Sequence, residues 1–157
     1  MMIRLCYASV RVENENDLLL DLSDILVTAR EFNAQHGIVG VLYYAEGSFF
    51  QCLEGENDQV LELFEAIQQD NRHTHVHQFK ITPIVELNFK QWSMKYVNPN
   101  TQISDYFKNI GLNKFEPNLL NAEQIGRFLE ILLNTANVEK PTKNYVGYQN
   151  RGYQNYF

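Results

Sequence analysis

The stretch from Gly37 to Gly55 constrains the fold most, because it holds two apolar runs separated by a short polar connector. Both runs are rich in β-branched and aromatic residues, and Ala45-Glu46-Gly47 between them places a glycine where a tight turn needs one. The pattern predicts a hairpin of two central strands. Because nearly every position is apolar, helices or a ligand should cover at least one face of the sheet.

One polar side chain interrupts the second run. Strand side chains alternate between faces, so Gln51 should project between Phe49 and Leu53, opposite to Phe50 and Cys52. A buried amide has donors and acceptors that need partners. Two interpretations stay open at this point: a core glutamine bonded to nearby backbone, or a polar group directed at a bound ligand.

The other elements follow an order typical of one architecture. The apolar spacing predicts a strand over 3–9, a helix over 17–33 capped by Asn16 or Asp17, and a helix capped by Asn57 or Asp58 that ends near residue 70. Further strands are predicted over 77–87, where Pro83 favours a sheet edge, and over 92–97. The order β-α-β-β-α-β-β predicts an α+β fold, a ferredoxin-like sandwich with a five-stranded mixed sheet and two helices on one face.

Alternation assigns the side chains of the predicted strands to faces. In the first strand, Tyr7 should share a face with Ile3, Leu5 and Ser9. In the last strand, Trp92, Met94 and Tyr96 should share one face and form part of the core.

The chain beyond residue 97 is predicted to be a helical extension. Asn98-Pro99-Asn100 ends the sheet region, and apolar stripes predict helices over 103–110 and 121–135 that dock on the sheet or on another subunit. Residues 141–157 repeat Gly-Tyr-Gln-Asn, which is typical of a flexible tail, with an added strand as the alternative. We therefore divide the chain into 1–97, 98–140 and 141–157.

Composition excludes several classes of protein. The formal net charge of −6 argues against a general nucleic-acid binder, which needs a basic face. No apolar run has the length of a membrane span, and the N-terminus lacks the apolar core of a signal peptide. Cys6 and Cys52 lie within apolar runs and are expected to be reduced core residues. These features predict a soluble cytoplasmic protein.

Catalytic and metal-binding motifs are not found in the sequence. His73, His75 and His77 alternate, but no cysteine or carboxylate joins them at ligand spacing, so no metal site is expected. The sequence contains neither a phosphate-binding glycine loop nor a nucleophile elbow. We therefore expect no enzyme activity.

Three polar side chains can nevertheless converge in this fold. Tyr7 near the end of the first strand, Gln51 on a central strand and Asn33 on the apolar stripe of a helix would outline a mostly apolar slot. Such a slot suits a flat aromatic cofactor. By default, Arg30 would be a solvated charge, and Asp70, Arg72 and His73 a cluster of caps and ion pairs at a helix end.

At these residues the sequence resembles the BLUF domain, a blue-light sensor that uses flavin. The resemblance covers roughly residues 1 to 97 and is carried by the following segments: Tyr7-Ala8-Ser9, Ala29-Arg30-Glu31-Phe32-Asn33, Gly37-Ile38-Val39-Gly40-Val41-Leu42, Phe49-Phe50-Gln51-Cys52-Leu53-Glu54-Gly55, Asp70-Asn71-Arg72-His73 and Trp92-Ser93-Met94. The remainder resembles the helical extension of short, stand-alone BLUF proteins.

The resemblance implies a bound flavin, FAD or alternatively FMN, between the two helices. It implies that Asn33 bonds the carbonyl edge of the ring, Ile25 packs on its face and Gln51 bridges Tyr7 and the flavin. It places four more residues around the other ring edge and the ribityl chain: Arg30, Asp70, Arg72 and His73. Phe32 departs from the family, where this position is often polar.

The function that the resemblance implies is blue-light sensing without substrate turnover. Tyr7 and Gln51 would form the photochemical relay, and Trp92 and Met94 would pass the changed hydrogen bonding to the C-terminal helices and a protein partner. We expect no direct nucleic-acid or membrane binding, and a second copy of the chain stays open as a partner. The alternatives are a flavoenzyme or small-molecule sensor without photochemistry, and a flavin-free interaction module.

Overall fold

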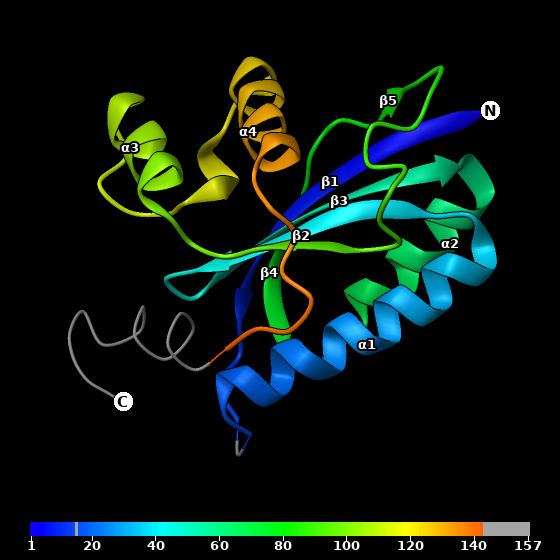
Figure 1. Ribbon diagram of the computed structural model, residues 1–157, viewed down its shortest axis with the longest axis horizontal. Helices are drawn as coiled ribbons and strands as arrows, with labels where there is room; N and C mark the ends of the chain where they lie inside the picture. Colours follow the sequence, from blue (N-terminus) through cyan, green and yellow to red (C-terminus); the bar gives the residue numbers. More distant parts are fainter. Residues whose placement is uncertain (15, 143–157) are drawn as a thin grey trace.

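The computed structural model describes residues 1–14 and 16–142, which form a twisted mixed sheet with helices on both faces (Figure 1). The main path of the sheet runs β4-β1-β3-β2-β6. All neighbours are antiparallel except β2 and β6, which are parallel. The strands are β1 (Met2–Arg11), β2 (Val39–Ala45), β3 (Ser48–Glu56), β4 (His73–Gln78) and β6 (Lys95–Val97), and the two-residue β5 (Thr82–Pro83) pairs with β1. The predicted α+β class with a five-stranded mixed path is confirmed. The predicted tail lies, from residue 143 on, outside the described residues.

The helices divide into two layers (Figure 1). On one face lie α1 (Leu18–His36) and α2 (Asn57–Gln68), as predicted. On the other lie α3 (Thr101–Asn109), the 3₁₀ turn η1 (Pro117–Leu119) and α4 (Ala122–Asn134). Each layer encloses its own apolar core, so both faces of the central strands are buried. Within the described part of the chain, no helix combines the length and the apolar character needed to cross a bilayer.

The central hairpin follows from its turn chemistry. Glu46 and Gly47 both adopt positive φ, 50° and 86°, and Ala45 pairs with Ser48. Two positive φ angles are typical of the two-residue turn that matches the twist of antiparallel strands. The turn fixes the register, so Phe49 and Leu53 face the α1–α2 layer, while Phe50 and Cys52 face the α3–α4 layer. The predicted faces of this strand are confirmed.

Local capping chemistry sets the ends of most helices. The Asp17 side chain accepts a hydrogen bond from the Leu20 amide, and Gly37 ends α1 in the left-handed conformation with φ 67°. Asn121 and Gln124 form a reciprocal capping box at the start of α4. The predicted cap of α2 is wrong, because Asn57 is already its first helical residue and Glu56 occupies the cap position without a side-chain bond.

The predicted strand over 77–87 is also wrong. β4 begins at His73 and ends at Gln78, and its register with β1 shifts between Ala8 and Val10, where His75 adopts a positive φ of 52°. Pro83 lacks the N–H that a longer ladder would need, so within residues 79–87 only Thr82 and Pro83 form strand pairs, both with β1.

The predicted strand over 92–97 is shorter than expected and its side chains point differently. β6 begins only at Lys95. Trp92 packs with the α3–α4 core, whereas Met94 and Tyr96 belong to the α1–α2 core. Alternation fails because the Trp92 carbonyl bonds to the Gly40 amide outside the ladder, at 3.3 Å.

Two glycines should respond oppositely to alanine. A Cβ on Gly40 would overlap the backbone carbonyl oxygen of Cys52, whereas a Cβ on Gly126, in the interior of α4, meets nothing within 4 Å. We expect Gly40→Ala to lower the free energy of unfolding by about 2 kcal/mol or more, because two paired strands must separate. Gly126→Ala should raise it by about 0.5–1 kcal/mol. Urea unfolding of both variants checks this, and equal stabilities would contradict the close strand packing at Gly40.

Candidate functional site

A cavity of about 210 Å³ lies between α1, α2 and the sheet. Its walls are mainly apolar, and its polar groups come from β1, α1, β3 and the segment after α2. The lining residues are Tyr7, Ile25, Thr28, Ala29, Asn33, Leu42, Phe49, Gln51, Leu63, Ala66, Ile67, Asp70, Arg72 and His73. A larger hollow of about 690 Å³ lies on the opposite face, between the β2–β3 turn and α3, away from these convergent polar groups. We therefore place the candidate site in the smaller, more apolar cavity.

Tyr7 and Gln51 form a hydrogen bond at the floor of this cavity. They are register partners across β1 and β3, and the Tyr7 hydroxyl donates to Gln51 Oε1 at 2.5 Å. Both side chains are 4% exposed. Burial, with a smaller contribution from the Asp70 charge, raises the pKa of Tyr7 well above its usual range. Tyr7 therefore remains a phenol at neutral pH and acts as the donor.

The amide nitrogen of Gln51 has a much weaker partner. Gln51 Nε2 donates to the Met94 sulfur at 3.5 Å, and Met94 is fully buried. A thioether is a weak acceptor, so one end of this amide is held firmly by Tyr7 and the other loosely by Met94. The arrangement lets the amide change partners at small cost.

Asn33 contributes a buried acceptor without a protein partner. Its Nδ2 donates to the Ser93 carbonyl at 2.9 Å, while its Oδ1 is buried and bonds to no described residue. An unsatisfied buried polar atom costs about 1–3 kcal/mol. Asn33 also lines the cavity. Its free oxygen therefore fits a ligand that presents an N–H or O–H group.

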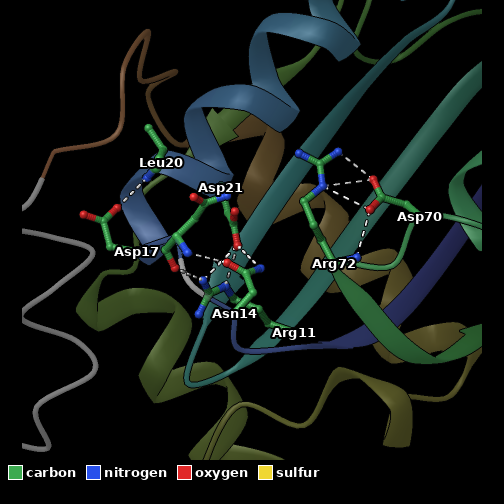
Figure 2. Close-up of polar contacts among 8 residues, drawn as sticks. Arg11, Asn14, Asp17, Leu20, Asp21, Asp70 and Arg72 are labelled. Carbon is green, nitrogen blue, oxygen red and sulfur yellow. Dashed lines mark hydrogen bonds and ion pairs between the residues drawn. The ribbon is translucent and has the colours of Figure 1, made fainter.

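The rim of the cavity carries charge. Arg72 donates to both carboxylate oxygens of Asp70, with a shortest distance of 2.6 Å (Figure 2). The guanidinium holds the pKa of Asp70 below its usual range, against the opposing effect of burial. In the same view lies a second ion pair, in which Arg11 donates to the buried Asp21 at 2.8 Å. Polar ligand groups leaving the apolar slot would meet the first pair.

His73 is fixed by two hydrogen bonds. Its Nε2 lies 2.7 Å from the Ile67 carbonyl, which can only accept, so this nitrogen carries the proton. Its Nδ1 lies 2.8 Å from the Ser9 hydroxyl, which can donate to it. The two contacts hold the His73 ring in place at the rim of the cavity. Within residues 1–14 and 16–142, no group of three or more His, Cys, Asp or Glu is placed to hold a metal ion.

Seven of the residues expected at the site line the cavity: Tyr7, Ile25, Asn33, Gln51, Asp70, Arg72 and His73. Met94 reaches the site through its contact with Gln51. Arg30 and Trp92 do not line it. The Arg30 guanidinium bonds backbone carbonyls, and the Trp92 ring lies on the opposite face, 4.1 Å from Lys95 Nζ.

Sequence reasoning missed part of the site. Leu63 and Ile67 line the cavity, although the apolar spacing in this part of the chain predicted only a helix. Lys95 was not singled out either, yet it is buried and donates to the Leu133 carbonyl at 2.8 Å. The apolar spacing of α2 could have identified Leu63 and Ile67 as inward-facing residues. The alternating pattern of β6 gives no sign that Lys95 is buried.

Comparison with known proteins gives a consistent result. The family model of BLUF, described as sensors of blue-light using FAD, matches residues 2–95. The solved structure of the photo-activated state of BlsA is 51% identical, with a TM-score of 0.85, and the match covers 88% of this chain and 99% of that one. The dark-state structure of BlrB, a BLUF protein, is 27% identical with a TM-score of 0.70, covering 84% of this chain and 95% of that one.

Curated relatives match over shorter stretches. Photoactivated adenylate cyclase subunit beta of Euglena gracilis is 42% identical over 76 residues, which are 48% of this chain and 9% of the relative. The blue light- and temperature-regulated antirepressor BluF of Escherichia coli (strain K12) is 34% identical over 55 residues, which are 35% of this chain and 14% of the relative. The matched stretch is thus a small part of these longer proteins.

The Asp70–Arg72 pair should stabilise the fold in a pH-dependent way. Because the folded-state pKa of Asp70 is lowered, its contribution is present above the ordinary carboxyl pKa of 3.8 and is lost as the pH falls through the folded value. Both side chains are about 30% exposed, so we expect Asp70→Asn to cost less than about 1 kcal/mol at pH 7.

Urea unfolding of wild type and variant at pH 7 and below pH 3.8 measures this difference. Glu139→Gln is the matched control, because Glu139 is 84% exposed and lies 3.8 Å from Arg30, so its loss should change little. A cost of Asp70→Asn that is the same at both pH values would contradict the ion-pair origin.

Proposed function

This chain belongs to the BLUF family of blue-light sensors, and on that premise we propose that its cavity binds FAD, or alternatively FMN, and that Tyr7 and Gln51 convert light absorption into altered hydrogen bonding. The observation that carries the proposal is the buried hydrogen bond from Tyr7 to Gln51 at 2.5 Å, with the opposite end of the amide on the Met94 sulfur. An oxidisable phenol thus donates directly to an amide oxygen that can accept its proton, and the nitrogen of the same amide is only weakly bonded.

The residues present fit a flavin. An isoalloxazine ring is flat and apolar on its faces, and it has one ring N–H between two carbonyls. The free acceptor Asn33 Oδ1 matches that N–H, while Ile25, Leu63 and Ile67 supply apolar walls. Asp70 and Arg72 lie at the rim, where the hydroxyls of a ribityl chain can bond them.

The mechanism follows from the protonation and placement of the two side chains. Bound flavin supplies a chromophore for blue light and, once excited, a strong oxidant. Tyr7 is a buried phenol, and when it loses an electron its proton becomes strongly acidic and passes to Gln51 Oε1 along the existing hydrogen bond. Return of the electron and proton leaves Gln51 rotated or tautomerised, so that different groups now donate and accept.

The change that Gln51 delivers is small. A net hydrogen bond is worth about 0.5–1.5 kcal/mol in a protein. Such an energy can only bias an element that is already nearly balanced between two arrangements. The element next to Gln51 is the segment Ser93–Met94, which is bonded outside any strand.

Absorption spectra before and after blue light test this function. The purified protein should carry flavin and show a reversible red shift of the flavin bands, because the hydrogen bond to the ring changes. Gln51→Ala and Tyr7→Phe should retain the flavin but lose the normal red shift. Gln68→Ala, an amide variant exposed at the end of α2, is the control and should shift like wild type.

Each of the other outcomes selects a different function. A bound flavin that does not respond to light would favour a flavoenzyme or a sensor without photochemistry. A colourless protein that takes up no added flavin would favour an interaction module. A full red shift in Gln51→Ala would overturn the relay.

We propose further that the signal leaves through the C-terminal extension, residues 98–140. Arg30 Nε donates to the Met94 carbonyl at 3.0 Å, and the same guanidinium donates to the carbonyls of Val138 and Glu139 at 3.1 and 2.6 Å. The Val138 amide in turn donates to the Tyr96 carbonyl at 2.7 Å. A shift of Met94 would therefore disturb the attachment of the chain that follows α4.

The output partner is proposed to be a protein. The net charge of −6 does not suit a phosphate backbone, and the match to BlsA and BlrB covers nearly all of those chains. We therefore propose that this BLUF region acts on a protein partner through residues 98–140.

Hydrogen exchange in light and darkness tests the output route. Light should raise exchange of the Val138 amide and of β6, because the contact at Met94 that supports them changes. Arg30→Ala should keep the red shift but show fast exchange at Val138 in both states. Arg127→Ala, exposed on α4, is the control. Light effects confined to the cavity, with Val138 unchanged, would place the output elsewhere.

A further inference from the structure

Cys6 and Cys52 lie directly opposite each other across β1 and β3. This rung is next to the Tyr7–Gln51 rung, but its side chains point to the other face, into the core beneath α4. Both thiols are free and buried, and both belong to the same apolar core. The two side chains therefore project from one rung of the ladder toward the same face of the sheet.

The strand register makes this rung suitable for a disulfide. The Cys6 carbonyl accepts from the Phe79 amide at 3.0 Å, on the side of the chain away from β3. In an antiparallel strand the N–H and C=O of one residue point to the same side, so Cys6 and Cys52 form a non-hydrogen-bonded pair. Such pairs have Cα atoms about 4.5 Å apart. A disulfide spans about 4.4–6.8 Å between Cα atoms, so it can close here without moving the strands far.

Only one of the two thiols is reachable from outside. Cys6 lines a cavity of about 360 Å³ between β1, the segment after β4 and α4. Gly126 on α4 lines this cavity and has no side chain to fill it. Two basic residues also line it: Lys80 is exposed, whereas the charge of Arg4 is paired with Glu54. Cys52 is completely buried behind Cys6. A small oxidant would therefore meet Cys6 first.

We propose that Cys6 and Cys52 form a peroxide-sensitive dithiol, with Cys6 as the attacked thiol and Cys52 as the resolving thiol. The Cys6 thiolate attacks one oxygen of hydrogen peroxide, the O–O bond breaks, and hydroxide leaves and is protonated to water. Cys52 then attacks the resulting sulfenic sulfur, the S–O bond breaks, and its thiol proton leaves with the hydroxyl as a second water. Two electrons pass from the thiols to the peroxide.

The disulfide would act on the light response, and this part rests on the proposed function. Closing an S–S bond fixes the separation of β1 and β3 on the rung adjoining Tyr7 and Gln51, and the usual disulfide spacing is slightly wider than that of such a pair. Because the hydrogen bond between those two residues is short and buried, a small strand shift alters its geometry. The rate at which the dark state recovers after illumination should then change.

The chemical test uses the full chain loaded with flavin and kept in darkness, treated with hydrogen peroxide and digested without reductant. We expect a peptide cross-linked between Cys6 and Cys52 that dithiothreitol separates. Cys52→Ser should instead accumulate a sulfenic acid on Cys6 that dimedone traps, and Cys6→Ser should leave Cys52 unmodified. Wild-type protein without the cross-link, or Cys52 modified equally in Cys6→Ser, would overturn the proposal.

The functional test compares dark recovery of oxidised and reduced protein. We expect the wild-type rate to change by about twofold or more, since a barrier change of 0.5 kcal/mol is about that factor. Cys52→Ser should show no peroxide effect on recovery. A cross-linked protein that recovers at the reduced rate would refute the coupling. Absence of any photocycle would count against the proposed function, while the cross-link would still be decided by mass.

Discussion

The hydrogen bond between Tyr7 and Gln51 is the constraint around which the sheet is arranged. A glutamine in an apolar layer must satisfy its amide, and the register of β1 and β3 supplies only one strong partner, the Tyr7 hydroxyl. The amide nitrogen of Gln51 donates to the Met94 sulfur, which is a weak acceptor. A fully satisfied network would be rigid, whereas this half-satisfied one can be exchanged at low cost. The proposed switch would therefore depend on this weak buried polar pairing.

The two faces of the sheet are packed differently. The α1–α2 face holds the cavity with the convergent polar groups, while the core of the α3–α4 face contains edge-to-face aromatic contacts among Tyr43, Phe107, Phe115 and Phe128. A packed aromatic layer transmits displacement but does not absorb it. At the far end, the buried Glu54 accepts from the amides of Asn88 and Phe89 and fixes the start of the segment that carries Met94.

Sequence reasoning succeeded where local rules decide the structure. Alternation assigned Gln51 to its face, a side-chain cap and a left-handed glycine set α1, and the convergence of Tyr7, Asn33 and Gln51 followed from the fold. The predicted side-chain directions were wrong between β5 and β6, because hydrogen bonds to distant parts of the chain set the backbone there. The Trp92 carbonyl, for example, accepts from the Gly40 amide. Arg30 lies next to the stripe of α1, and no periodic pattern could show that its guanidinium bonds three carbonyls.

In the proposed output route, Lys95 connects the segment that carries Met94 to α4. It follows Met94 directly, is 1% exposed, and its ammonium donates to the Leu133 carbonyl in the last turn of α4, with the Trp92 ring 4.1 Å away. Burial lowers the pKa of this amine, so the charge depends on the partial negative charge at the helix end and on the ring face. Buried electrostatic contacts are weakly screened and change steeply with distance. Because Lys95 follows Met94 directly, the proposed output route predicts that a rearrangement at Met94 changes the contact between β6 and α4.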